Sequence, residues 1–213
     1  MASETAQAGE SSSEPVPSFG GNRVCLDFIN SLDDRKGEPK EHLYAYTDLV
    51  AWGVSAELLT KPEANILRRN ASAHQSEAER VFEQAIMLRE ALYRIFYAVA
   101  KNADLPPAEL SALHHGYVNA LPYAQLRPTE LGFDWVWPAD ALEAPLWRLM
   151  HDAVELLRTG QHARFKECAN DASCGWLFYD TSKNNSRRWC SMASCGTAEK
   201  VQQQRQKRQA SRG

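Results

Sequence analysis

The chain has 213 residues, of which 44% are hydrophobic and 24% are charged, and its formal net charge is −3 at pH 7. This length and composition are typical of one globular domain with a sizeable core and a small appended module. No run of about 18 apolar residues occurs, which argues against a membrane-spanning helix.

Residues 1–18 are polar and acidic and contain no apolar core of a secretory signal. We therefore expect a disordered leader followed by a protein of the reducing cytoplasm. In that compartment clustered cysteines favour a bound metal over disulfides.

The first ordered segment is expected at residues 19–32, where the apolar positions leave helix and strand equally open. Thr47 is placed to cap a short helix that follows a charged loop. Thr60 is placed to cap a second helix, with Pro62 in the first turn, where proline is tolerated.

The clearest predicted helix covers residues 76–101. Ser76 and Glu79 have the spacing of a capping box. Apolar residues then recur at alternating intervals of four and three, which places one stripe against a core; they are Val81, Ala85, Leu88, Leu92, Ile95 and Val99.

Pro106 and Pro107 are expected to start a further helix that runs to about residue 120, and another helix is predicted over residues 139–158, ended by Thr159 and Gly160. Between them, alternating apolar residues at 123–127 and 133–137 predict a small hairpin joined through Pro128 and Gly132. The chain up to residue 160 is therefore expected to form one helical domain.

Four cysteines lie within 28 residues near the C-terminal end, at positions Cys168, Cys174, Cys190 and Cys195. Two close pairs with a hairpin-length spacer suit one tetrahedral metal ion, and four thiolates favour a structural Zn²⁺ ion. An iron–sulfur cluster and a disulfide pair are the alternatives. The fifth cysteine, Cys25, is expected to be a buried thiol.

The spacer between the two cysteine pairs predicts a hairpin. The aromatic run at 176–179 is expected to pair with a returning strand at 187–189, with a turn at Asn184 and Asn185. Residues 197–209 contain no Gly or Pro and are expected to form a helix. Such a module buries too little apolar surface to fold alone, so the metal would supply its folding free energy.

Charge is distributed unevenly along the chain. Residues 161–213 hold ten Lys or Arg and four Asp or Glu, a net charge of +6, so the other 160 residues carry −9. A basic end on an acidic body indicates binding to a polyanion such as DNA. The candidate contacts are Arg187, Arg188, Lys200, Arg205, Lys207 and Arg208.

The segment CGWLFYDTSKNNSRRWCSMASCG, with the cysteines before it and the basic stretch to about Arg208, resembles the CGNR zinc finger. The stretches GNRVCLDFIN and MLREALYRIF, with the helix around Trp52, are similar to the ABATE domain that precedes this finger in bacterial stress-induced transcription regulators. The resemblance implies that the four late cysteines are zinc ligands and that the finger binds DNA.

One departure concerns the signature itself. Where the family has Cys-Gly-Asn-Arg, this chain has Cys195-Gly196-Thr197-Ala198. If the family arginine contacts a phosphate or a base, this chain lacks that contact. Thr197 is instead placed to cap the last helix with its hydroxyl.

The sequence contains neither a Gly-rich phosphate loop nor a Gly-x-Ser-x-Gly nucleophile elbow, and its six histidines lack partners at ligand spacing, so no enzyme is expected. Four polar residues are candidates for a small-molecule pocket in the helical domain: Arg23, Asp27, Asn30 and Arg89. The alternative favoured for Asp27 and Asn30 is that they cap or join neighbouring backbone.

The predicted fold class is mainly α. A leader at 1–18 precedes a helical domain at 19–160 with a small hairpin, and a four-cysteine zinc module at 161–213 consists of a hairpin and a helix. The predicted function is transcription regulation through DNA binding, with the helical domain as a sensor or assembly domain. The alternative is a zinc-stabilised protein–protein interaction module. A small-molecule effector and a homodimer are the further partners considered.

Overall fold

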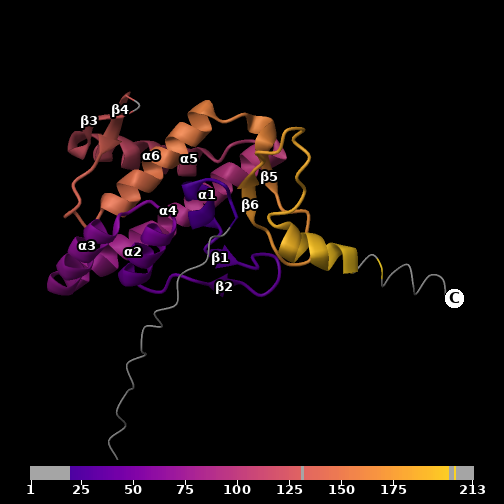
Figure 1. Cartoon of the computed structure of the whole chain (residues 1–213), viewed down its shortest axis with the longest axis horizontal. Coiled ribbons are helices and arrows are strands. Elements are labelled where there is room, and N and C mark those ends of the chain that lie inside the picture. The colour runs from indigo at the N-terminus through magenta and orange to yellow at the C-terminus, as the bar shows by residue number, and fades with distance from the viewer. Residues whose placement is uncertain (1–19, 131, 202–203, 205–213) are drawn as a thin grey trace, which may run out of the picture.

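The computed structural model describes residues 20–130, 132–201 and 204, so the predicted leader lies outside the described residues. Helices dominate residues 20–160 (Figure 1). They are α1 (Val24–Ile29), α2 (Tyr46–Ser55), α3 (Lys61–Ala73), α4 (Gln75–Lys101), α5 (Pro107–Ala120) and α6 (Ala144–Thr159).

Short strands and turns complete the described chain. Three two-stranded antiparallel sheets pair β1 (Leu32–Asp33) with β2 (Lys40–Glu41), β3 (Gln125–Thr129) with β4 (Gly132–Val136), and β5 (Phe165–Glu167) with β6 (Leu177–Tyr179). Two 3₁₀ turns, η1 (Leu121–Tyr123) and η2 (His162–Arg164), and one π-helical turn, η3 (Met192–Gly196), occur between and after them.

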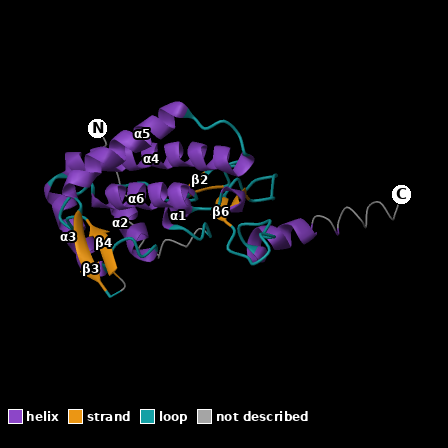
Figure 2. Ribbon diagram, turned by 90° about the horizontal axis from the view of Figure 1, so that it is seen from above, coloured by secondary structure: helices purple, strands orange, loops and turns teal. Residues whose placement is uncertain are grey.

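Helix α4 is the centre of the fold. It packs against the other five helices of the body and against β5 and β6, and it lies alongside α5 and α6 (Figure 2). Its stripe is largely buried as predicted: Val81, Ala85, Leu92 and Ile95 lie in the core with Phe28 and Trp52 of earlier helices. No helix in the described part of the chain is long and apolar enough to cross a membrane.

The helix starts differ from the predictions in two places. Thr60 caps α3 as predicted, since its hydroxyl accepts from Glu63 N and the Glu63 carboxylate accepts from Thr60 N at 2.8 Å. Thr47 and Ser76 are not caps, because each lies one residue inside its helix. At α2 the Asp48 carboxylate instead accepts from the backbone N–H groups before the helix.

The β3–β4 hairpin forms at the predicted place, but Pro128 is not in its turn. Pro128 pairs with Phe133 inside the ladder, and both strands are exposed along their whole length. Helix α6 begins at Ala144, five residues later than predicted, and ends before Gly160 as predicted.

The strand pairing near the cysteines was predicted wrongly. β6 pairs with β5, and residues 187–189 form no strand. Asn185 adopts a positive φ of 49° and turns the chain as expected. The backbone groups of residues 187–188 have other partners than β6: Arg187 N donates to the Asp180 carboxylate, and Arg188 O accepts from Ala169 N.

Phe165, Leu177 and Tyr179 belong to the same hydrophobic core as the helices. The C-terminal module is therefore seated on the helical body through its sheet. Figures 1 and 2 place this module and the β3–β4 hairpin at opposite ends of the molecule.

Candidate metal centre

The four late cysteines converge at one point. Their sulfur atoms lie within 4.8 Å of one another, and Cys190 Sγ is 3.6 Å from both Cys174 Sγ and Cys195 Sγ. Zn–S bonds of about 2.3 Å in a tetrahedron require S–S distances of about 3.8 Å. None of the five cysteines forms a disulfide. The residues present therefore fit one four-coordinate zinc ion, which would have a structural role.

Two N–H groups point at the sulfur atoms of this cluster. Cys190 N donates to Cys168 Sγ at 3.4 Å, and the Asn170 side-chain amide donates to Cys195 Sγ at 3.5 Å. Hydrogen bonds of this kind orient ligands and offset the negative charge of four thiolates around a divalent ion.

The thiols of the cluster influence one another's pKa. Hydrogen bonds from Cys174 and Cys190 lower the pKa of Cys168, whereas hydrogen bonding to Cys168 raises the pKa of Cys174 and of Cys190. A coordinated metal ion deprotonates its thiols outright.

A buried carboxylate organises the loop between the two cysteine pairs. Asp180 is fully buried, and its oxygens accept from Lys166 Nζ at 2.7 Å, Ser182 N at 2.8 Å and Arg187 N at 2.9 Å. Burial alone would raise the pKa of Asp180, but the hydrogen bonds from Lys166 and Ser182 outweigh it and hold the pKa well below its usual range. The carboxylate thus remains ionised and fixes the path of the chain toward Cys190.

The β1–β2 loop of the helical body holds the first cysteine pair. Arg35 N donates to Cys174 O at 3.1 Å, and Lys36 N donates to Ser173 O at 2.8 Å. Gly175 has a φ of +68°, and a Cβ there would lie 3.0 Å from Arg35 Cβ. Glycine is therefore required where the two backbones approach each other.

Asn30 joins the helical body to the finger through contacts that no pattern in the sequence indicated. Its buried side chain donates to Leu177 O at 2.8 Å and accepts from Leu177 N at 3.0 Å. A second backbone contact runs from Tyr179 N to Gly21 O at 3.0 Å. Strand β6 is thereby bonded to β5 on one side and to the start of the body on the other.

The other three candidate pocket residues also have internal partners. Arg23 lies over the Tyr179 ring, 5.1 Å from its centroid. The Asp27 carboxylate accepts from Gly21 N at 2.5 Å, and burial raises its pKa. These contacts assign both residues to the packing of the N-terminal segment.

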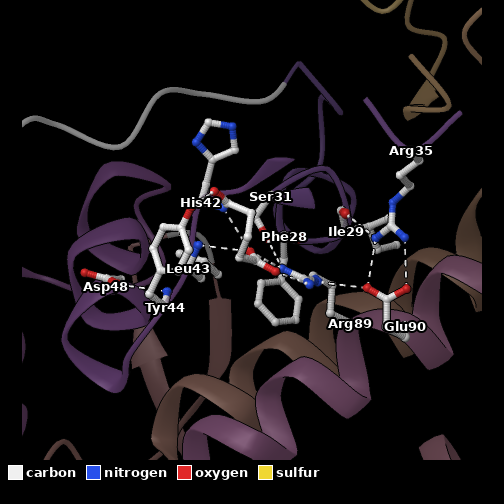
Figure 3. A network of polar contacts seen from close by, with 11 residues as sticks. Phe28, Ile29, Ser31, Arg35, His42, Leu43, Tyr44, Asp48, Arg89 and Glu90 are labelled. Carbon is white, nitrogen blue, oxygen red and sulfur yellow. Dashed lines mark hydrogen bonds and ion pairs between the residues drawn. The ribbon is translucent and has the colours of Figure 1, made fainter. Parts of the chain in front are cut away.

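Arg89 is buried in a network of polar contacts (Figure 3). Its guanidinium binds Glu41 at 2.6 Å, Ser31 at 3.1 Å and Glu90 at 3.0 Å, and Glu90 in turn binds Arg35 at 2.9 Å. The four residues of the predicted pocket, Arg23, Asp27, Asn30 and Arg89, thus each make internal contacts, and the pocket itself stays a prediction. The network ends at Arg35, whose backbone holds Cys174.

The candidate DNA contacts fall into three groups. Arg187 is half-buried: it lies over the Phe178 ring at 4.4 Å and donates to the carbonyls of Gly20, Trp189 and Cys190. Arg188, which lies over the Trp189 ring at 5.0 Å, and Lys200, in the helical run 197–201, are exposed. Arg205, Lys207 and Arg208 lie outside the described residues.

The last helical run starts earlier than predicted. It begins with η3, where the Ser191 hydroxyl accepts from Ser194 N, and continues through residues 197–201. Thr197 is therefore not its cap. The Thr197 hydroxyl donates to Met192 O at 2.9 Å within the turn.

Comparison with known proteins gives two matches. Residues 22–160 match the ABATE family model, described as "Putative stress-induced transcription regulator", and residues 164–208 match the CGNR zinc finger. No curated protein matches the chain. The finger match and the convergence of the four sulfur atoms together show a site for one structural zinc ion.

Proposed function

Because the chain belongs to the ABATE family and ends in a CGNR zinc finger, we propose that it is a cytoplasmic transcription regulator that binds DNA through the finger. The observation that carries the proposal is the position of the last helical run. It follows directly on the four-cysteine cluster and extends away from the body (Figure 2).

The cationic side chains of the finger fall into two groups, those that bond within the module and those that are exposed. Arg164, Lys166 and Arg187 donate to backbone oxygens within the module and so hold its loops. Lys183, Arg188 and Lys200 are exposed. Arg205, Lys207 and Arg208 follow in the sequence and extend the same positive charge. Exposed cations that meet phosphates release counterions, which makes DNA binding strong at low salt and weak at high salt.

A protein–protein interaction module is the second candidate. Met192 and Val201 are 53% and 42% exposed on the last helical run, and Thr197-Ala198 replace the Asn-Arg of the family signature. Exposed apolar side chains beside polar ones also suit a protein partner. In that case the zinc ion would stabilise a docking surface with no nucleic-acid role.

Fluorescence anisotropy with duplex DNA of mixed sequence separates the two candidates. We expect the wild type to bind at low salt, and the variants R188Q/K200Q and R205A/K207A/R208A to bind more weakly on every sequence. The slope of log affinity against log salt should fall by about 0.9 for each lost phosphate contact.

The matched control is K61Q/R68Q/R69Q, which removes three exposed cations from α3 in the body. It should bind like the wild type. Equal weakening by the control would show a response to total charge alone, and absent binding at low salt would favour the protein–protein candidate.

A further inference from the structure

The four sulfur ligands are unequally protected. Cys168, Cys174 and Cys190 are 1%, 5% and 3% exposed, whereas Cys195 is only partly buried. A cavity of about 260 Å³ is lined by Cys195 together with Cys174 and Cys190, but not by Cys168. A small polar molecule therefore reaches the Cys195 sulfur more readily than it reaches Cys168.

A second thiolate lies beside Cys195. Cys190 Sγ is 3.6 Å away, and five positions separate the two residues in the sequence. A reactive cysteine with a resolving cysteine at this distance is the arrangement of a reversible thiol switch. Zinc coordination keeps both sulfur atoms ionised, which is the state that reacts with oxidants.

The two cysteine pairs differ in how they are anchored. The backbone of Cys168 and Cys174 is bonded to Trp176 O and Arg35 N, so this pair remains fixed to the residue that precedes β6 and to the body. Cys195 lies in η3, and its sulfur accepts from Asn170 of the first loop. The helical run 197–201 continues directly from η3. Cys195 is thus the ligand that attaches the last helix to the rest of the finger.

We infer that Cys190 and Cys195 form an oxidation site for small peroxides, and that their disulfide releases zinc and frees the last helix. The Cys195 thiolate attacks a peroxide oxygen and the O–O bond breaks. Hydroxide leaves, and Cys195 becomes a sulfenic acid. The Cys190 thiolate then attacks that sulfur and displaces a second hydroxide. Two thiolates have lost two electrons, and one hydrogen peroxide has become two water molecules after protonation.

The consequence for metal binding follows from the ligand count. Two of the four thiolates are consumed, and the remaining pair, Cys168 and Cys174, retains zinc far more weakly than a closed set of four. The effect on DNA rests on the proposed function, because loss of the ordered helix removes Lys200 from its fixed position. Thiol reductants and added zinc would restore both.

The test is peroxide titration of the zinc-loaded full chain, carried out in the C25A background. Cys25 is fully buried, and removing it leaves only the four late cysteines to react. Released zinc is measured with a chromogenic chelator, and disulfides are mapped by mass spectrometry. We expect one zinc released per hydrogen peroxide consumed and a Cys190–Cys195 disulfide. A Cys174–Cys190 disulfide, or zinc retained in excess peroxide, would overturn the inference.

The matched variant is C195H, because imidazole is also a zinc ligand but forms no sulfenic acid. Its zinc release by peroxide should be at least about tenfold slower, since attack must then begin at a buried sulfur. Release as fast as in the C25A background would contradict the role of Cys195. If C195H does not load zinc, competitive alkylation of the C25A protein decides instead: Cys195 must be modified before the other three.

DNA binding is measured on the same oxidised and re-reduced samples. Loss and recovery of binding would link the switch to regulation. If the reduced protein binds no DNA at all, the proposed function fails, while the disulfide map still decides whether the oxidation site exists.

Discussion

The helical body and the finger both have buried interiors, but the two interiors are built from different groups. In the body, α4 places side chains such as Leu92 and Ile95 in a core shared with five other helices. In the finger, a separate small cluster contains Phe178 and three cysteines, with two tryptophans at its edge. So small a cluster cannot offset the conformational entropy lost on folding, and a metal ion supplies the difference.

The finger part of the sequence is stabilised partly by the apolar core of the body and only partly by zinc. Strands β5 and β6 lie in the finger part of the sequence, yet Phe165 and Leu177 belong to the body's core. Asn30 and the backbone of Arg35 then bind the finger from the body side. The metal-dependent part is therefore expected to be smaller than the matched finger and to consist of the loops that carry the cysteines.

Removal of zinc should produce the largest difference between the finger and the helical body. With a strong chelator at neutral pH, amide hydrogen exchange should increase in residues 168–176 and 181–201, because their fold depends on coordination. The amides of α4 and of β6 should remain protected. Unchanged exchange around the cysteines, or simultaneous loss of protection in α4, would contradict separate stabilisation.

Substitution of Asn30 by leucine should have a smaller effect, directed at the junction. It leaves the N–H and C=O of Leu177 buried without these partners, so the free energy of unfolding should fall by about 2–4 kcal/mol. The control N119L changes an exposed asparagine on α5 and should stay within about 0.5 kcal/mol of the wild type. Denaturant unfolding measures both, and equal values for the two variants would show that the Asn30 contacts are not needed.

Local patterns in the sequence predicted much of this structure. The cysteine spacing indicated the metal cluster, because a short loop between two cysteines five or six positions apart lets both bind the same ion. The three-four repeat located α4, and Thr60 with Pro62 marked the start of α3.

Contacts between distant residues could not be predicted in this way. Asn30 and Leu177 are 147 positions apart, and β6 has the apolar character to pair with either 165–167 or 187–189. The charge of Arg187 is visible in the sequence, whereas its carbonyl partners are not. Ser76 and Thr47 have cap-forming side chains, but each helix begins one residue before its predicted cap.

The measurement that tests the central claim most directly is zinc stoichiometry and coordination in the purified chain, by native mass spectrometry and X-ray absorption at the zinc edge. We predict one zinc per chain surrounded by four sulfur atoms at about 2.3 Å. A metal-free folded chain, or a zinc ion bound mainly by nitrogen and oxygen, would contradict the assignment of Cys168, Cys174, Cys190 and Cys195 as the group that shapes the finger.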